Sequence, residues 1–409
     1  MQTKIKDDVI YNLIMKQLKN RFSLYTEPQK VKEMGIYPYF RTICSDQDCE
    51  VLMNGRKVLM FGSNSYLGLT NHPKIIEAAI EALKKYGSGC AGSPFLNGTL
   101  DIHIQLEEKL AKFVGKESSI VFSTGFQSNI GAIPTMLGRG DHLILDELDH
   151  ASIIEARRIS YSKNYKFKHN DMASLEEVLK RIPLQELKLI AVDGVYSMEG
   201  DIANLPQIKQ LAEKYNADIY VDEAHSLGVF GKGGRGICNH FGLTDDVDVI
   251  MGTFSKSLAA IGGFIAADKE TINYLKHTSR PYIFSASISP SATASVIAAL
   301  DIMEQEPQRI DNLWQITNYS LAAFKANGFE IGPTNSPIIP LYIRDTEKTF
   351  MITKEIYEEG IFVNPVIPPA CSPDATLIRF SLMATHTHQQ VDIAIDKLTK
   401  VFKKYEVIH

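Results

Sequence analysis

A single lysine, Lys256, lies in the stretch GTFSKSLAAIGGF at residues 252–264, with hydroxyl side chains on both sides of it. The run just before it, VDVIM at residues 247–251, is apolar and predicts a strand buried on both faces. Ligands in open α/β sheets bind where such strands end. A solvated surface charge is the ordinary interpretation of a lysine, so a reactive amine is indicated only if other segments supply partners for it.

A carboxylate follows a second apolar run. Asp222 ends the run ADIYV within the segment ADIYVDEAHSLGVFG. Removing a carboxylate from water costs free energy unless a cation or a hydrogen-bond donor meets it. A structural ion pair would meet that need, and so would a protonated pyridine nitrogen. The second interpretation also explains why an acid and a lysine both lie at the ends of neighbouring predicted strands.

Three further residue patterns could bind ligands. In STGFQSNIGAIPTML, Gly125 and Phe126 open a helix after a strand, and free backbone N–H groups there favour a phosphate. Arg379 lies inside an apolar strand. A substrate carboxylate would match the geometry of its planar guanidinium group, and an aspartate or glutamate of the chain is the alternative partner. His150 stands between a strand and a helix, so hydrogen bonding at the helix start and catalysis both remain open.

Together these patterns offer an amine for a Schiff base, a carboxylate for a pyridinium, a helix start for a phosphate and an arginine for a carboxylate. Pyridoxal phosphate requires this set of groups, so the sequence predicts that cofactor. Two glycine-rich patterns do not change the prediction. GSGCAG at residues 87–92 follows a helix instead of a strand, and GKGGRG at 231–236 lacks the Walker A order.

The composition limits the class of protein. The 409 residues are 44% hydrophobic and 22% charged, which is typical of a soluble globular protein with two or three domains. A net charge of -5 without any Lys/Arg block gives no reason to expect nucleic acid. The five cysteines lack zinc spacing and suit a reducing cytosol, so we expect no metal and a cytoplasmic location.

Alternating helix and strand patterns predict the fold class α/β, with a mainly parallel sheet in a large three-layer domain. The predicted strands are SSIVFST, DHLILDE, LKLIAVDGVYS, ADIYVDEAHS and VDVIMGTFS. We place an N-terminal helix and arm at 1–60, the large domain at 61–290 and a smaller α+β domain at 291–409. The first 22 residues mix charges too often for a signal peptide or membrane span, and predict an amphipathic helix on a partner surface.

The chain resembles the α-oxoamine synthases, pyridoxal-phosphate enzymes of the fold-type I aminotransferase superfamily, over nearly its whole length. The matching segments include NSYLGLTNHP, GSGCAGSPFLNGTLDIHIQLEEKLAKFVG, STGFQSN, DHASII, SMEGDIANLP, VDEAHSLGVFG, GTFSKSL and RFSLMATHT. Within the family, the segments YPYFRTI, VLMFGSNSYLGL, FLNGTLDIH, FVNPVIPPA and IRFSLMATHT are most similar to the bacterial serine palmitoyltransferases.

The resemblance implies a role for each residue around the cofactor ring. Lys256 would hold pyridoxal phosphate as a Schiff base and then move the α-proton of the substrate. His150 would stack on the ring and orient the substrate carboxylate and acyl carbonyl. Asp222 would pair with the pyridine nitrogen, while His225 and Ser197 would contact the ring hydroxyl.

The resemblance also implies a shared site in a homodimer. The residues expected to hold the phosphate are Gly125, Phe126, Thr253, Ser255 and, from the second subunit, Ser285. Arg379 would bind the amino acid carboxylate, and Asn64 would line the site from across the dimer.

The implied reaction is a decarboxylative condensation of an amino acid with a long-chain acyl thioester, carried by coenzyme A or acyl carrier protein. L-Serine, giving 3-oxo-sphinganine for sphingolipid synthesis, is the first expectation. Cysteate, giving a sulfonolipid precursor, is the second, and glycine or alanine the third. The family usually has arginine where this chain has Pro94, which leaves serine and cysteate open. Acyl length, the carrier and a peripheral contact with the membrane stay open as well.

Two other classes would use part of the same residue set. A simple aminotransferase would share Lys256 and Asp222 but would need no acyl channel and release no carbon dioxide. A non-catalytic partner subunit would keep the fold alone, and it has no physical need for Lys256, His150 and Asp222 together.

Overall fold

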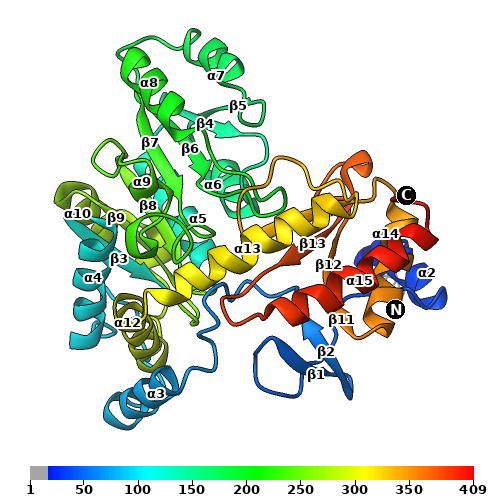
Figure 1. Ribbon diagram of the computed structural model, residues 1–409. Coiled ribbons are helices and arrows are strands. Elements are labelled where there is room, and N and C mark those ends of the chain that lie inside the picture. The colour runs from blue at the N-terminus through cyan, green and yellow to red at the C-terminus, as the bar shows by residue number, and fades with distance from the viewer. Residues whose placement is uncertain (1–16) are drawn as a thin grey trace, which may run out of the picture.

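The structure, a computed structural model, describes residues 17–409 (Figure 1). The amphipathic helix expected at residues 1–22 therefore lies largely outside the described residues, of which 17–23 are helical. In this described part of the chain, no helix is both long and apolar enough to cross a membrane.

A seven-stranded sheet forms the centre of the larger part, in the order β3-β9-β8-β7-β6-β4-β5. Its strands are β3 (Ser118–Phe122), β4 (His142–Asp146), β5 (Lys163–Phe167), β6 (Lys188–Asp193), β7 (Asp218–Asp222), β8 (Val249–Thr253) and β9 (Gly263–Ala267). All neighbouring pairs are parallel except those of β9, which runs antiparallel to both β3 and β8. The five predicted strands are present. β5 and β9 were not predicted, because one is mostly polar and the other begins among glycines.

Helices cover both faces of this sheet and make three layers (Figure 1). The helices of the larger part are α3 (Pro73–Tyr86), α4 (Asp101–Val114), α5 (Gly125–Met136), α6 (Ala151–Ile159), α7 (Met172–Leu179), α8 (Leu205–Tyr215), α9 (Ile237–His240), α10 (Lys269–Thr278), α11 (Arg280–Ile283) and α12 (Pro290–Gln305), with a 3-10 turn at Lys232–Gly234. Successive residues of a strand point to opposite faces. Leu143 and Leu145 accordingly join one buried cluster and Ile144 the other, so both faces of β4 are packed.

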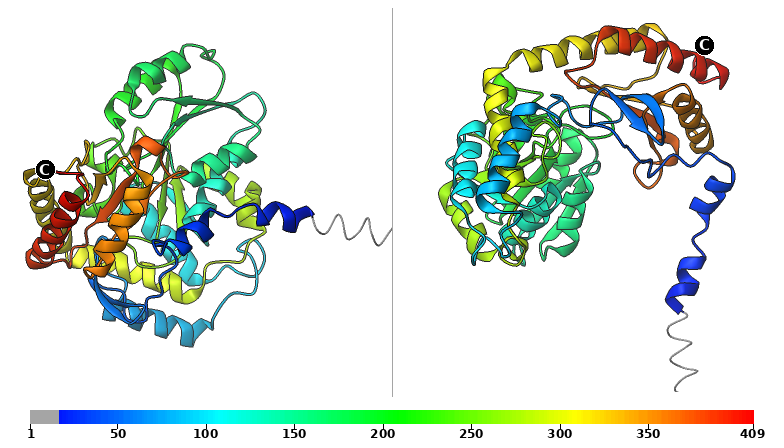
Figure 2. Two further views of the ribbon diagram at one scale, coloured as in Figure 1. Left: turned by 90° about the vertical axis from the view of Figure 1, so that its right-hand side faces the viewer. Right: turned by 90° about the horizontal axis from the view of Figure 1, so that it is seen from below.

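The smaller part contains two three-stranded sheets, with orders β10-β13-β12 and β1-β2-β11. Their strands are β1 (Glu50–Met53), β2 (Arg56–Met60), β10 (Ile338–Tyr342), β11 (Ile361–Phe362), β12 (Asn364–Val366) and β13 (Leu377–Ser381). The helices here are α2 (Glu27–Glu33), α13 (Gln308–Ala326), α14 (Thr346–Glu358) and α15 (His388–Lys404), with a 3-10 turn at Pro373–Ala375. α13 extends from the larger part to the smaller one (Figure 1), and α13 and α15 lie along one side of the molecule (Figure 2).

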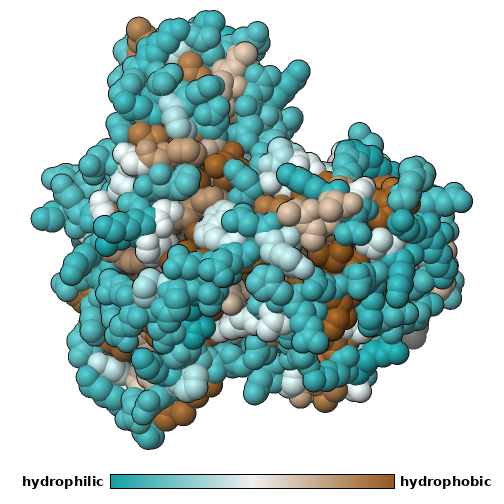
Figure 3. Space-filling model, viewed as in Figure 1, coloured by the Kyte–Doolittle hydropathy of each residue, from teal (hydrophilic) through white to brown (hydrophobic). Residues whose placement is uncertain are grey.

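The packing relates segments that are far apart in the chain. β2 pairs in parallel with β11, so the strands at residues 50–60 lie with the C-terminal segment. α12 packs against α3 and α4 of the larger part. The domain boundaries at 60 and 290 stay a prediction. Figure 3 shows that most of the viewed face is hydrophilic, with hydrophobic residues in separate groups.

Candidate functional site

A cavity of about 340 Å³ lies at the edge of the central sheet where β6, β7 and β8 end. The parallel strands deliver their last residues to the same edge, which is where ligands bind in such folds. The cavity is lined by eight of the predicted site residues, namely Gly125, Phe126, His150, Asp222, His225, Thr253, Ser255 and Lys256. The fold therefore brings together residues that are spread over 132 positions of the chain between Gly125 and Lys256.

Lys256 lies in the turn that joins β8 to β9 and is half-buried. Burial lowers the pKa of its amine to about 8, although Asp222 and Asp193 favour the charged form. Loss of water around an ammonium group favours its neutral form. A far larger fraction of this amine is neutral near pH 7 than for an ordinary lysine, as a nucleophile requires.

Asp222, the last residue of β7, is only 3% exposed, and two donors hold its carboxylate. The Asn129 side-chain amide donates to Oδ2 at 2.7 Å, and the Ala224 backbone N–H donates to Oδ1 at 2.9 Å. No lysine, arginine or histidine of residues 17–409 forms an ion pair with it. The buried carboxylate is thus oriented by neutral groups and faces a cavity that could hold its cation.

The start of α5 forms a cradle beside the end of β8. Thr124 caps the helix by accepting a hydrogen bond from the Gln127 backbone N–H, at 3.1 Å. A Cβ atom on Gly125 would lie 2.4 Å from Thr253 Oγ1, so only glycine fits there without displacement. The hydroxyls of Thr253 and Ser255 are 3.1 Å apart on the same side. Helix N–H groups and hydroxyl groups in one place fit the oxygens of a phosphate.

His150 caps the start of α6 and lies at the same cavity. Its Nδ1 accepts a hydrogen bond from the Ser152 backbone N–H at 3.2 Å. Desolvation lowers the pKa of the His150 ring, and so does Lys256, against the opposite effect of Asp222. The ring is therefore neutral at pH 7, with its proton on Nε2. Its backbone N–H donates to Asp193 Oδ2 at 3.1 Å, which ties the β4–α6 loop to the end of β6.

Arg379 of β13 reaches the edge of the site from the smaller part. It is 5% exposed, and its Nη2 donates to the hydroxyl of Tyr66 at 3.2 Å. Nη1 donates to Ser381 Oγ at 2.6 Å and Nε donates to the carbonyl of Ser197 at 2.5 Å. No carboxylate of the described chain pairs with this buried cation. The internal acid considered as its alternative partner is absent from residues 17–409.

Four predicted residues do not line the cavity of their own chain: Asn64, Ser197, Ser285 and Arg379. Arg379 and Ser197 lie beside it. Arg379 donates to the Ser197 carbonyl and to the Tyr66 hydroxyl, and that hydroxyl contacts His225, which lines the cavity. Asn64 has a buried side-chain oxygen without a partner in the described residues. Ser285 lines a separate small cavity together with Pro94.

Sequence reasoning missed three buried residues of the site, Tyr66, Asn129 and Asp193. All three lie in segments that contain other residues of interest. Asp193 ends β6 as Asp222 ends β7, so the same rule of a carboxylate after an apolar run could have found it. Burial and the neighbouring Asp222 raise the pKa of Asp193 well above its usual range. Asn129 and Tyr66 carry no comparable signal, because their partners lie far away in the sequence.

Known proteins share this architecture. Residues 56–398 match the family described as aminotransferase class I and II. The chain is 60% identical over 391 residues to a serine palmitoyltransferase of Bacteroides ovatus, covering 96% of this chain and 99% of that one. It is 41% identical over 382 residues to an 8-amino-7-oxononanoate synthase of Thermosipho melanesiensis, covering 93% and 98%.

A solved serine palmitoyltransferase from S. paucimobilis with bound PLP and myriocin superimposes with a TM-score of 0.93. It is 34% identical and covers 96% of this chain and all of that one. The predicted fold class and cofactor are confirmed by these matches, and the cavity residues fit the group. The chain belongs to the aminotransferase class I and II family, as a fold-type I, pyridoxal-phosphate-dependent acyltransferase of the α-oxoamine synthase kind.

Proposed function

We propose that the enzyme condenses L-serine with a long-chain acyl thioester, releasing carbon dioxide and forming 3-oxo-sphinganine, the first step of sphingolipid synthesis. One observation carries the amino acid part: Arg379 is a buried cation without an acidic partner in residues 17–409, beside the cavity that holds Lys256. A buried charge is costly unless it is paired, and a substrate carboxylate would pair it bidentately. Relatives named serine palmitoyltransferase support the choice of substrates.

We assign the residues that would hold pyridoxal phosphate from the family resemblance, and the lining of the cavity supports the assignment. Lys256 would bond to it, Asp222 would face its pyridine nitrogen, and His225 would face its ring hydroxyl, with Ser197 beside them. Its phosphate would take the cradle residues Gly125, Phe126, Thr253 and Ser255. When bound, the cofactor supplies an electron sink for the negative charge that develops at the substrate α-carbon.

Side chains of the protein would bind the amino acid, take up its α-proton and donate hydrogen bonds to the reacting groups. Arg379 would hold the amino acid carboxylate, and Asn64 of the second copy would close that side of the site. The amine of Lys256, whose pKa is about 8, would take the α-proton near neutral pH. His150, neutral with its proton on Nε2, would donate a hydrogen bond to the substrate carboxylate and then to the acyl carbonyl.

A spectral titration with L-serine, L-cysteate, glycine and L-alanine tests the amino acid, followed by thiol release from palmitoyl-coenzyme A and palmitoyl-acyl carrier protein. We expect a saturable change in visible absorbance and thiol release with L-serine. A response confined to L-cysteate would reassign the enzyme to sulfonolipid synthesis, and one confined to glycine or alanine to another α-oxoamine synthase. Lys256→Ala is the control, because it should bind no cofactor that borohydride can fix to the chain.

We also propose that the working form is a homodimer in which the second copy supplies Ser285. Three apolar side chains on one face of α3, Ile76, Ile80 and Leu83, are each at least 45% exposed. Phe284, next to Ser285, is 76% exposed. Apolar groups exposed in such numbers mark a contact surface. Equilibrium sedimentation should give twice the chain mass of 45.7 kDa.

Mixing two inactive variants tests whether the site is shared. Lys256→Ala removes the amine, and Ser285→Asp places a negative charge where the phosphate would lie. A mixed dimer keeps one intact site only if Lys256 and Ser285 of different copies meet. Recovery of up to about a quarter of the activity after joint refolding supports this arrangement, because half of the dimers are mixed and each has one intact site of two. No recovery would place Ser285 in its own chain's site.

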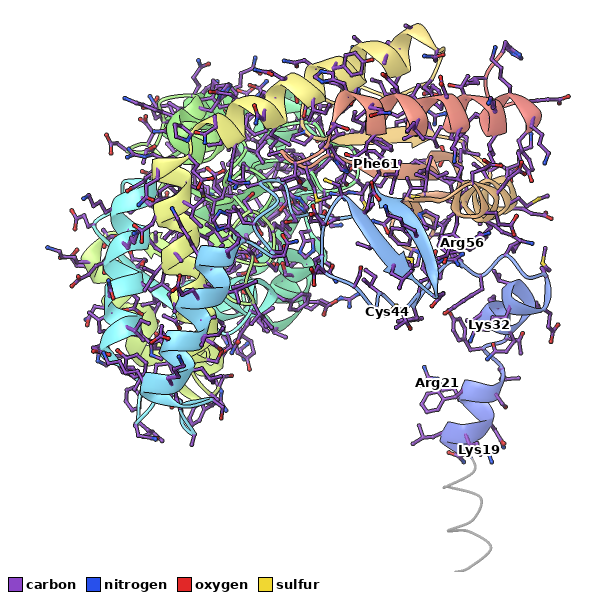
Figure 4. The ribbon with its side chains drawn as sticks, turned by 60° about the horizontal axis from the view of Figure 1, so that its bottom comes forward. Lys19, Arg21, Lys32, Cys44, Arg56 and Phe61 are labelled. Atoms are coloured by element: carbon purple, nitrogen blue, oxygen red, sulfur yellow. The ribbon has the colours of Figure 1, made fainter. Side chains whose placement is uncertain are left out.

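We place the enzyme in the cytoplasm, with the N-terminal arm as its contact with the inner membrane face. All five cysteines are free, as a reducing compartment predicts. Lys19 and Arg21 lie on the arm that extends away from the body (Figure 4), close in sequence to the exposed Leu18 and Phe22. Cell fractionation and flotation with anionic vesicles test both statements, and a protein that stays wholly soluble would contradict the membrane contact.

A further inference from the structure

The hydroxyl of Tyr66 connects two parts of the site that the proposed function treats separately. Tyr66 is fully buried, and its hydroxyl oxygen is 2.6 Å from Nδ1 of His225 and 3.2 Å from Nη2 of Arg379. Tyr66 lies just beyond β2, His225 beyond β7, and Arg379 within β13. Three segments from both parts of the molecule therefore meet at one oxygen atom.

The hydrogen atoms that each side chain can donate decide the direction of each hydrogen bond. An arginine side chain can only donate, so the Tyr66 oxygen accepts from Arg379. Tyrosine has one hydroxyl proton, and it is then directed to His225 Nδ1, which must be an unprotonated acceptor. Burial and the nearby Lys256, Arg379 and His150 lower the pKa of His225 well below its usual value, so the ring is neutral. A neutral imidazole with a bare Nδ1 carries its proton on Nε2.

We propose that Tyr66 is a positioning residue that fixes His225 as an Nε2–H donor toward the cavity while holding the fork of Arg379 in place. This inference rests on the proposed function for its cofactor part, since the acceptor in the cavity would be the ring hydroxyl oxygen of pyridoxal phosphate. Without the tyrosine hydroxyl, Nδ1 could carry the proton instead. Nε2 would then be an acceptor facing an oxygen atom, and that hydrogen bond would be lost.

Tyr66→Phe tests the inference, because it removes only the hydroxyl and keeps the buried ring. The matched control is Tyr196→Phe. Tyr196 is also fully buried, and in the described residues its hydroxyl makes no hydrogen bond to His225 or Arg379. Removing that hydroxyl should change neither the tautomer of His225 nor the cofactor spectrum. Both variants are made in the full-length chain.

The first measurement is the tautomer of His225, read from long-range proton–nitrogen spectra of the chain labelled with ¹⁵N-histidine. The signal is assigned by its loss in His225→Asn among the 11 histidines. We expect a protonated Nε2 in the unmodified chain, and protonation that moves wholly or partly to Nδ1 in Tyr66→Phe. A protonated Nδ1 in the unmodified chain, or an unchanged tautomer in Tyr66→Phe, would overturn the proposal.

The second measurement uses the chain loaded with pyridoxal phosphate. A donor to the ring oxygen lowers the proton affinity of the nitrogen that joins the ring to Lys256. Losing the donor should therefore move the pH midpoint of the visible absorbance upward and raise the cofactor dissociation constant about tenfold. An unchanged midpoint would contradict the proposal. If the unmodified chain takes up no pyridoxal phosphate, the proposed function fails, while the tautomer measurement still decides the role of Tyr66.

Discussion

At the scale of single residues, the cavity changes the chemistry of Lys256 through its surroundings. Burial removes water from the amine, and the two carboxylates of Asp222 and Asp193 oppose the effect only in part. The net result is a pKa of about 8, compared with 10.5 for an ordinary solvent-exposed lysine. The amine is thus prepared for attack near neutral pH before any ligand enters.

The rate at which the cofactor-free chain captures pyridoxal phosphate should follow this titration. Below its pKa the amine is protonated and cannot attack, so the rate should rise about tenfold per pH unit and level off above about pH 8. Stopped-flow absorbance measures the rate. Nα-acetyl-lysine, which has a free ε-amine, is the reference. Its rate should keep rising toward pH 10.5, the pKa of an ordinary lysine. A plateau only near that value in the protein would mean that Lys256 is not desolvated.

Asn129 is the residue on which the orientation of Asp222 depends. Its amide donates to Asp222 Oδ2 and to Ser152 Oγ, and its oxygen accepts from the hydroxyl of Tyr220. Asn129→Ala should weaken cofactor binding about tenfold or more, since a hydrogen bond to a charged group contributes about 1.5–3 kcal/mol. Fluorescence titration measures the dissociation constant. Asn327→Ala, on the exposed end of α13, is the control. Lower thermal stability with unchanged affinity would assign Asn129 a structural role only.

At the scale of elements, the contact between α5 and β8 determines the shape of the phosphate cradle. Gly125 is the first residue of α5, and Thr253 is the last residue of β8. A Cβ atom at position 125 would lie 2.4 Å from the Thr253 hydroxyl oxygen. Real Cβ atoms do not approach so closely, so a side chain there must push the helix start and the strand end apart.

Gly125→Ala should therefore raise the dissociation constant for pyridoxal phosphate at least about tenfold, by displacing phosphate donors whose bonds are charge-assisted. Alanine is more favourable than glycine in a helix by about 1 kcal/mol. This gain opposes the strain from the added side chain, so the melting temperature should change little. Gly138→Ala, just beyond the other end of α5, meets its nearest atom at 3.4 Å, an ordinary contact, and should leave affinity unchanged. Equal losses in the two variants would exclude the cradle as the cause.

At the scale of the whole molecule, one aromatic stack connects the two three-stranded sheets of the smaller part. Phe61 is fully buried, and its ring lies between those of Phe380 and His386, with both centroid distances at 4.3 Å. Phe61, which is labelled in Figure 4, directly follows β2. The segment from Phe61 to Tyr66 thus carries site residues from the small sheets toward the cavity.

Phe61→Ala should lower the free energy of unfolding by about 3–5 kcal/mol, as expected for a buried phenylalanine. Urea unfolding followed by fluorescence measures it. Phe22→Ala is the control, because Phe22 is 66% exposed on the arm and its loss should cost less than about 0.5 kcal/mol. A small effect at Phe61 would mean that the stack is not a structural connection. A raised KM for the amino acid substrate should accompany the destabilisation, since Tyr66 and Arg379 would lose their alignment.

Local sequence patterns determined much of this protein. The runs that form β7 and β8 are apolar because both sheet faces are covered, and this pattern alone is enough to place Asp222 and Lys256 at strand ends. A helix start after a strand likewise locates Gly125. These features depend on residues that are close in sequence, where the hydrophobic periodicity of strands and helices can be recognised.

Only the tertiary structure decided the contacts between distant segments. Tyr66 and His225 are 159 positions apart, and Tyr66 and Arg379 are 313 apart, yet they share hydrogen bonds. The antiparallel course of β9 and the pairing of β2 with β11 are equally non-local. Such contacts follow from how whole elements pack to bury their apolar faces. No pattern inside one segment records which distant side chain will satisfy a buried hydroxyl.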